Sequence, residues 1–264
     1  MTTISSRDNS LLRQARSVRD GKIDELIFVE GLRLAEEALR SGLEIEAVIY
    51  SDEIADKERA ARFLEAAALA CTRLASVGEK LLATISFTKT PQGIILLAKR
   101  PESGKTKLEI SEGPPPLLVI LHGLNNPVNV GAIMRSAEAA GATGIVTTTN
   151  TADPFSPKSL RGAMGSAFRL PIWRDAGYGD ALSWCAAHKI KTVCADVRAS
   201  TLYTDINWTT PRALIVGPES TGLSLEDVDA ADEAVRIGML GEVESLNVGV
   251  AAGILLYEAA RQRR

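Results

Sequence analysis

The sequence has few cysteines, no long apolar run and no apolar leader. Its three cysteines, Cys71, Cys185 and Cys194, are an odd number without metal-ligand spacing, so we expect neither a disulfide framework nor a metal site. No apolar run is long enough to span a bilayer. The first 19 residues are polar and lack the apolar core of a signal peptide. These absences predict a cytoplasmic protein with reduced thiols.

Two nucleotide-binding signatures are also missing. There is no Gly-x-Gly-x-x-Gly fingerprint and no Walker lysine, so neither a dinucleotide-dependent oxidoreductase nor a nucleoside triphosphate site is supported. What the chain does have is 264 residues, of which 45% are hydrophobic and 24% charged. This composition predicts a well-packed core, and the length suits two domains.

The net charge of −3 at first argues against a nucleic-acid partner, but basic residues gather in three places. Residues 1–22 hold five basic and two acidic side chains, and residues 158–174 hold four basic side chains and no acidic one. The last four residues add three arginines. Local basic patches on an acidic body suit a protein that contacts a few phosphates. Ordinary solvated charges explain the same pattern, and charge alone favours that explanation.

A linker is expected at residues 106–116, because three consecutive prolines, Pro114 to Pro116, favour an extended chain. This boundary gives a first domain over residues 1–105 and a second over residues 117–264. In the first domain, short apolar runs alternate with helical periodicity, which predicts a small α/β domain. We expect strands at 27–29, 45–50 and 94–98 and helices at 32–40 and 58–70.

The second domain also alternates strands and helices. Leu117–Leu121 is a continuous apolar run, which is typical of a strand buried on both faces. Such alternation predicts a mainly parallel sheet covered by helices, with ligands bound at the carboxyl ends of the strands. We expect further strands at 144–148, 192–195, 213–216 and 234–237, and helices at 131–140 (ended by Gly141), 182–188 and 246–263.

Three clusters lie where those strands and helices join. The first is Asn129 to Arg135, at the start of a helix, where Asn129 could serve as a cap. The second is Gly217 to Leu223, a glycine-rich turn after a strand. The third begins at Ser245, a candidate N-cap for the last helix. Singly, each cluster has a plain structural explanation as a cap, a turn or a tightly packed helix.

Together, in this order, the clusters resemble the three motifs of the SpoU (TrmH-type) RNA methyltransferases of the SPOUT superfamily. The matching residues are Asn129-x-Gly131-x-Ile133-x-Arg135, Val216-Gly217-x-Glu219-x-x-Gly222-Leu223 and Ser245-Leu246-Asn247-Val248 running to Glu258. The similarity covers residues 117–264. It implies an α/β fold whose C-terminal, mainly parallel-sheet methyltransferase domain contains a deep trefoil knot, although chain-path rules disfavour knots in general.

The first domain resembles the small α/β RNA-binding domain that often precedes this catalytic domain. The matching residues are Phe28 to Leu34 and Thr90 to Ile94. The resemblance implies RNA contacts at Arg33 and, from the basic loop of the second domain, at Lys158 and Arg161. By analogy with the family, ribosomal RNA is favoured over tRNA as the substrate.

The resemblance also implies S-adenosylmethionine as the methyl donor and a homodimer as the working form. Carried over by position, the cofactor contacts are Gly217, Ile237, Met239 and Leu246. The family usually has proline between the positions of Ile237 and Met239, where this chain has Gly238, so the stiffness of that loop is in question. No metal is implied, and we expect structural roles for His122 and His188.

The implied reaction is in-line attack of a ribose 2′-hydroxyl on the sulfonium methyl group, with Arg135 as the catalytic arginine. A guanidinium loses its proton only above about pH 12, so we favour a phosphate clamp that stabilises the developing alkoxide over a general base. Asn129 would orient Arg135 or the ribose, and Glu219 would fix the loop geometry and hold Arg135 or the substrate. Ser245 and Asn247 would complete the pocket.

Three rival hypotheses remain open at this point. The target could be a tRNA, or the enzyme could methylate a base nitrogen, as other members of the superfamily do. The chain could also be an RNA-binding protein that keeps the fold without turnover. The presence of Asn129, Arg135, Glu219 and Asn247 argues against the loss of activity.

Overall fold

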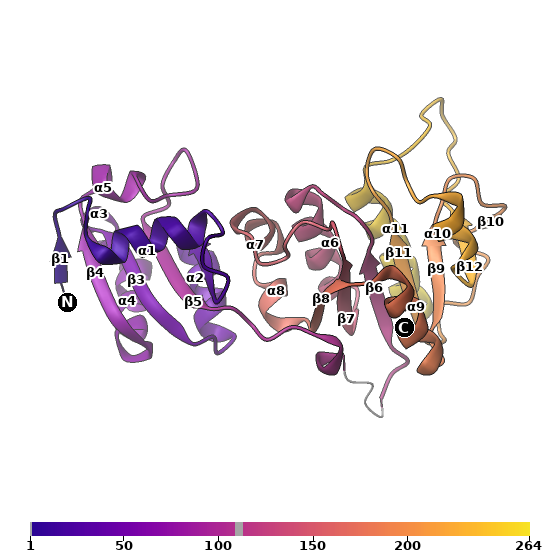
Figure 1. The fold of residues 1–264 in the computed structure, drawn as a ribbon, viewed down its shortest axis with the longest axis horizontal. Coiled ribbons are helices and arrows are strands. Elements are labelled where there is room, and N and C mark those ends of the chain that lie inside the picture. The colour runs from indigo at the N-terminus through magenta and orange to yellow at the C-terminus, as the bar shows by residue number, and fades with distance from the viewer. Residues whose placement is uncertain (1, 109–112) are drawn as a thin grey trace. The chain divides into compact units, whose positions relative to one another are not determined.

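The computed structural model describes residues 2–108 and 113–264, so part of the expected linker, residues 109–112, lies outside the described residues. The chain forms two compact units (Figure 1). The first contains residues up to Pro101 together with Phe155–Arg169, and the second contains Glu102–Pro154 and Leu170–Arg264. In the described part of the chain, no helix is long and apolar enough to cross a membrane.

The first unit is built on a mixed five-stranded sheet with the strand order β1-β4-β3-β5-β2. Strand β4 pairs in parallel with β1 and β3, whereas β5 runs antiparallel to β2 and β3. The elements are β1 (Thr2–Ile4), α1 (Ser10–Arg19), β2 (Leu26–Glu30), α2 (Leu32–Arg40), β3 (Ile45–Ser51), α3 (Asp52–Ala55), α4 (Glu58–Ala70), β4 (Cys71–Val77), α5 (Glu79–Ala83) and β5 (Ile94–Lys99), with α7 (Pro157–Ala163) and α8 (Ser166–Arg169) from the later segment.

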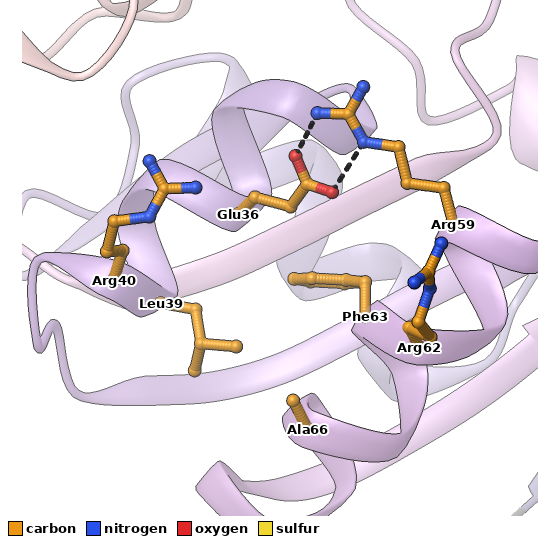
Figure 2. Close-up of a pocket in the computed structure, with 7 residues that line it drawn as sticks. All are labelled: Glu36, Leu39, Arg40, Arg59, Arg62, Phe63 and Ala66. Atoms are coloured by element: carbon orange, nitrogen blue, oxygen red, sulfur yellow. Dashed lines mark hydrogen bonds and ion pairs between the residues drawn. The ribbon is translucent and has the colours of Figure 1, made fainter.

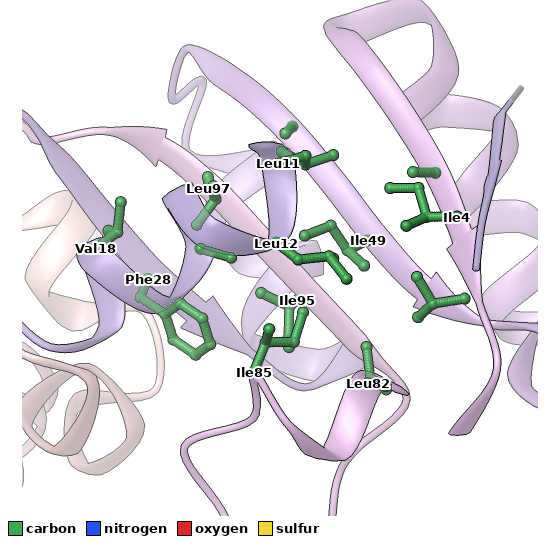
Figure 3. Packing of buried hydrophobic residues seen from close by; sticks show 14 of the residues in the cluster. Ile4, Leu11, Leu12, Val18, Phe28, Ile49, Leu82, Ile85, Ile95 and Leu97 are labelled. Atoms are coloured by element: carbon green, nitrogen blue, oxygen red, sulfur yellow. The ribbon is translucent and has the colours of Figure 1, made fainter. Parts of the chain in front are cut away.

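Both faces of this sheet are buried, which explains the continuous apolar runs of β2, β3 and β5. Successive residues of a strand point to opposite faces. Ile49 and Ile95 pack with Leu11 and Leu12 of α1, as Figure 3 shows. Their strand neighbours, such as Val48, are equally buried on the other face, where α2 and α4 lie. The hydrophobic effect of this two-sided burial is the main force holding the unit together.

The second unit is a seven-stranded sheet with the order β10-β12-β9-β11-β6-β7-β8, and every pair in it is parallel. The mainly parallel sheet predicted for the second domain is therefore confirmed. The elements are η1 (Lys105–Lys107), β6 (Leu117–Leu121), α6 (Pro127–Ala139), β7 (Gly144–Thr148), β8 (Ile172–Ala176), α9 (Tyr178–Ala187), β9 (Lys191–Ala195), β10 (Thr201–Leu202), β11 (Arg212–Val216), α10 (Leu225–Asp229), β12 (Glu233–Arg236) and α11 (Val248–Gln262).

Helices cover both faces of this sheet. On one face, Ala181 and Cys185 of α9 pack with Ile120 of β6 and Ile215 of β11. The alternate strand residues are equally buried on the opposite face, where we place the pair of helices α6 and α11, which pack on each other. In a parallel sheet the carboxyl ends of all strands lie at one edge, so the loops that follow β6, β11 and β12 start from the same edge.

Three predicted helix starts were wrong. The helix expected at 182–188 is α9, which begins four residues earlier, at Tyr178. Helix α6 begins at Pro127 and not at Gly131, with Asn126 as its N-cap and Pro127 at the first helical position, where a missing N–H costs nothing. The last helix begins at Val248, and its cap is Asn247 instead of Ser245. The predicted ending of α6 at Gly141 agrees with the structure, in which Gly141 has a φ of +81° just after the cap residue.

Candidate functional site

Asn129 joins the three sequence clusters. It does not cap α6: it lies in the first turn, is only 8% exposed, and its Nδ2 donates a 3.0 Å hydrogen bond to Oε1 of Glu219. Its Oδ1 accepts a 3.4 Å hydrogen bond from Nδ2 of Asn247. These two contacts orient the amide group, and they bring residues from positions 129, 219 and 247 to one place at the carboxyl edge of the sheet.

Asn247 both caps helix α11 and contacts Asn129. Its Oδ1 accepts hydrogen bonds from the backbone N–H groups of Gly249 and Val250, at 2.9 and 3.4 Å, and thereby caps α11. Its Nδ2 is then left to contact Asn129. The start of the last helix is consequently fixed against the first turn of α6.

Small residues allow α6 and α11 to pack closely. A Cβ atom placed on Gly249 would lie 3.2 Å from Oδ1 of Asn247 and 3.8 Å from Cβ of Ala132. One turn later, a Cβ atom on Gly253 would lie 4.0 Å from Oγ of Ser136. The tight packing expected from the small-residue face of the last helix is present, and it holds the Asn129–Asn247 contact in position.

The turn after β11 has no room for a side chain at its first residue. A Cβ atom on Gly217 would lie 2.7 Å from Cγ and 2.9 Å from the backbone nitrogen of Leu223, which real Cβ atoms do not tolerate. The turn is closed by a 3.0 Å hydrogen bond from the Gly222 N–H to the carbonyl of Pro218, and Gly222 has a φ of +65°. Both glycines of this cluster are therefore required by geometry.

Arg135 and Ser245 lie apart from this hydrogen-bonded group. Both side chains are exposed, and neither side chain forms a hydrogen bond or an ion pair with a described residue. The predicted contact between Glu219 and Arg135 is not present, because Glu219 bonds to Asn129 instead. The guanidinium of Arg135 and the hydroxyl of Ser245 are thus available to a bound substrate.

The predicted cofactor contacts differ in burial. Gly217 is buried, whereas Ile237, Met239 and Leu246 are half-buried. Among the described residues, no backbone hydrogen bond is formed by the N–H or C=O groups of residues 238–246. Half-buried apolar side chains beside unpaired backbone donors and acceptors suit a ligand with an apolar ring and polar edges. The residues present therefore fit an adenosine-containing cofactor.

The two histidines lie against aromatic rings. The ring of His122 is 4.2 Å from that of Tyr178, and its Nδ1 is 3.0 Å from Oγ1 of Thr148. His188 lies 4.1 Å from the ring of Trp184 and bonds to the backbone of the same residue. These contacts agree with the structural roles expected for both.

The predicted RNA contacts belong to the first unit. Arg33 lies on α2, and Lys158 and Arg161 lie on α7, and all three are exposed. The first unit also presents an open groove of about 380 Å³ with an apolar floor that includes Leu39 and Phe63 (Figure 2).

The arginines that line the groove are already paired. Each bonds to a glutamate on α2 or α4: Arg59 to Glu36, Arg40 to Glu37 and Arg62 to Glu58. The hydrogen bond from Arg59 holds the pKa of Glu36 below its usual value. Because a carboxylate neutralises each guanidinium, the groove lacks the free positive charge that phosphate binding needs.

Comparison with known proteins identifies the chain. The model of the SpoU rRNA Methylase family matches residues 116–257, and that of the MRM3-like substrate binding domain matches residues 12–96. The chain belongs to the SpoU rRNA methylase family. The match runs through all three clusters, so the resemblance on which the sequence analysis rests is confirmed.

Individual relatives agree with this assignment. A 23S rRNA (guanosine-2′-O-)-methyltransferase RlmB from Burkholderia is 34% identical over 218 residues, which cover 81% of this chain and 88% of the relative. A 23S rRNA uridine 2′-O-methyltransferase from Streptomyces viridochromogenes is 31% identical, covering 89% of this chain and 83% of the relative. An AdoMet-bound rRNA methyltransferase from Sinorhizobium meliloti superimposes with a TM-score of 0.85 at 29% identity, covering 98% and 97% of the two chains.

The protein is thus a SpoU-type RNA 2′-O-methyltransferase that uses S-adenosylmethionine. The expected α/β fold, reaction and methyl donor are confirmed. The hypotheses of a base methyltransferase and of an RNA-binding protein without turnover are set aside by the same comparisons.

Proposed function

We propose that this enzyme methylates the ribose 2′-hydroxyl of one nucleotide in 23S rRNA and works as a homodimer. Two relatives that match most of the chain bear the name of a 23S rRNA 2′-O-methyltransferase, and residues 12–96 match a substrate-binding domain. The observation that carries the ribose chemistry is the joining of Asn129, Glu219 and Asn247 at one place, with the exposed Arg135 on the same helix α6 as Asn129.

Arg135 is proposed as the group that contacts the reacting nucleotide. Bound S-adenosylmethionine supplies an electrophilic methyl group next to a positive sulfur. The exposed guanidinium, with no partner among the described residues, would bind the phosphate beside the target ribose and stabilise negative charge developing on the 2′-oxygen. A general-base role is chemically less suited to a guanidinium.

The Asn129–Glu219–Asn247 group is proposed to shape the pocket around that ribose. Asn129 uses its amide group within the protein, which leaves the second oxygen of Glu219 available to accept a hydrogen bond from a ribose hydroxyl. Ser245, which is exposed two residues before Asn247, would add a hydroxyl donor. Because the ribose is already held in position, less entropy is lost on reaching the transition state.

The cofactor is proposed to bind between the turn at Gly217 and the loop of residues 237–246. Gly217 would admit the ligand next to the backbone, and Ile237, Met239 and Leu246 would contact its apolar parts.

We also propose that the loops after β11 and β12 form the trefoil knot known in this superfamily. Residues 1–105 would act as the RNA-binding domain and residues 117–264 as the catalytic domain. Arg33, Lys158 and Arg161 would bind RNA phosphates.

Methyl transfer to separated RNAs tests the substrate. The protein is incubated with methyl-labelled S-adenosylmethionine and with 23S rRNA, 16S rRNA or tRNA that lack the modification. Label in 23S rRNA alone is the expected result, and Arg135→Ala is the matched inactive control. Label in tRNA would overturn the proposed substrate.

Light scattering tests the proposed homodimer. It should give twice the mass of the 28.2 kDa chain, and a monomer at micromolar concentration would contradict the proposal.

A further inference from the structure

Asp196 lies directly after β9, at the edge of the sheet that carries the site. Its side chain is only 5% exposed, and one carboxylate oxygen accepts hydrogen bonds from the backbone N–H of Arg198 at 2.7 Å and from its Nε at 2.9 Å. The hydrogen bond from Arg198 holds the pKa of Asp196 below its usual value, against the opposing effect of burial. The carboxylate is therefore charged at neutral pH and fixes the guanidinium in one orientation.

The guanidinium of Arg198 reaches from this carboxylate to the turn after β11. One of its terminal nitrogens donates a 3.0 Å hydrogen bond to the carbonyl oxygen of Leu223. Leu223 is 4% exposed, and its side chain fills the space in which Gly217 would otherwise carry a Cβ atom. Arg198 thus holds the end of the turn whose beginning is the proposed cofactor contact Gly217.

The same aspartate also contacts the strand that leads to the second cofactor loop. The backbone N–H of Asp196 donates a 2.9 Å hydrogen bond to the carbonyl of Val235 in β12. Two residues after Val235 the chain reaches Ile237, where the loop of residues 237–246 begins. The segment Asp196–Arg198 is consequently tied to both segments between which the cofactor is proposed to bind.

A purely stabilising ion pair is the alternative explanation. The side chain of Arg198 is 51% exposed, and an ion pair with an exposed partner adds little to stability. The Arg261–Glu258 pair has the same design, an exposed arginine on a carboxylate that is 8% exposed, but it lies within α11. It shares the pairing and lacks the contact with the cofactor turn.

We propose that Arg198, held by Asp196, is a positioning residue for S-adenosylmethionine that fixes the Gly217–Leu223 turn through the carbonyl of Leu223. This inference rests on the proposed cofactor contacts and adds a residue outside the three sequence clusters. An arginine suits the task because its planar guanidinium can bond to a carboxylate and to a carbonyl at the same time, which a lysine ammonium does less precisely.

Binding of S-adenosylhomocysteine by calorimetry, without RNA, tests the role directly. In Arg198→Ala the Kd should rise about tenfold, the size expected for losing one hydrogen bond from a charged group. Arg198→Lys should lie between the wild type and Arg198→Ala. In steady-state assays the KM for S-adenosylmethionine should rise in parallel, while kcat at saturating cofactor and the KM for RNA stay within about twofold.

Arg261→Ala is the matched control, and its Kd should equal that of the wild type. An unchanged Kd in both Arg198 variants would overturn the proposal, as would a KM for RNA that rises as much as the Kd. A fall in Tm equal in Arg198→Ala and Arg261→Ala, with both Kd values unchanged, would assign Arg198 to stability alone. Because the measurement needs no RNA, a wrong choice of RNA substrate does not affect it.

Discussion

The side-chain amide of Asn129 donates a 3.0 Å hydrogen bond to the carboxylate of Glu219, which lies ninety residues further along the chain. The contact joins the first turn of α6 to the turn after β11. Because Asn129 also accepts a hydrogen bond from Asn247, a single amide joins three separate segments at one edge of the sheet. The proposed pocket depends on this amide, and the first prediction concerns it.

A double variant in which the donor and acceptor of the Asn129–Glu219 hydrogen bond are exchanged should recover activity that a single substitution removes. Asn129→Asp places two carboxylates at hydrogen-bond distance, and we expect kcat/KM to fall by about a hundredfold, since a charged hydrogen bond is lost and repulsion is added. The double variant Asn129→Asp/Glu219→Gln restores one donor and one acceptor. It should be at least tenfold more active than Asn129→Asp. Equal activity of the two variants would show that the bond has no part in catalysis.

Removal of the Arg135 guanidinium should affect catalysis and leave cofactor binding intact. For Arg135→Ala we expect kcat to fall by about 10²–10³-fold, which is the usual cost of removing a donor to a developing negative charge. Arg135→Lys keeps the charge without the planar fork and should retain part of the activity. Single-turnover methylation and calorimetry with S-adenosylhomocysteine measure the two effects. Normal turnover of Arg135→Ala would exclude the residue from the mechanism.

A methyl group at Gly217 should disturb the cofactor turn. The new Cβ atom would collide with backbone and side-chain atoms of Leu223, so the turn must shift. We expect Gly217→Ala to weaken S-adenosylhomocysteine binding by at least tenfold. Gly179→Ala is the matched control: nothing lies within 4 Å of its Cβ position in α9, and alanine favours a helix. Tight binding by Gly217→Ala would disprove the proposed contact.

Acid should remove the stabilising effect of Glu258. Hydrogen bonds from Arg261 lower the pKa of Glu258 from its usual value of 4.5 to about 2, against the opposing effect of burial. A carboxylate with a depressed native pKa stabilises the fold above its unfolded pKa and loses that effect as the pH falls through its native pKa. The Tm difference between wild type and Glu258→Gln should therefore be constant above about pH 5 and shrink between pH 4.5 and 2. A difference independent of pH would contradict this assignment.

Much of the fold follows from local patterns in the sequence. Long apolar runs such as Leu117–Leu121 were placed correctly as buried strands, and the helices at 32–40 and 58–70 have the predicted bounds. The elements that were missed are polar or short. Helix α1 begins at an ordinary Asn9 cap, and β4 begins with the half-exposed stretch Cys71–Leu74. Such elements are stabilised by packing against distant strands, which periodicity does not reveal.

The sequence singled out Asn129, Glu219 and Asn247, which the structure brings together, but it did not predict the contacts between them. Asn129 was interpreted as a helix cap because it precedes the helical pattern, whereas Asn126-Pro127 is the pair that starts α6. Glu219 was expected to hold Arg135 and instead holds Asn129. Arg198 belongs to none of the three clusters, and its contact with Leu223 arises only when β9 and β11 become neighbours in the sheet.

The most direct test of the central claim is the chemical form of the transferred methyl group. RNA labelled by the wild-type enzyme is hydrolysed with alkali, which needs a free 2′-hydroxyl to cleave the neighbouring phosphodiester bond. Methylation of the ribose 2′-oxygen predicts that the label is recovered entirely in alkali-resistant dinucleotides. Label in ordinary mononucleotides would place the methyl group on a base and contradict the account.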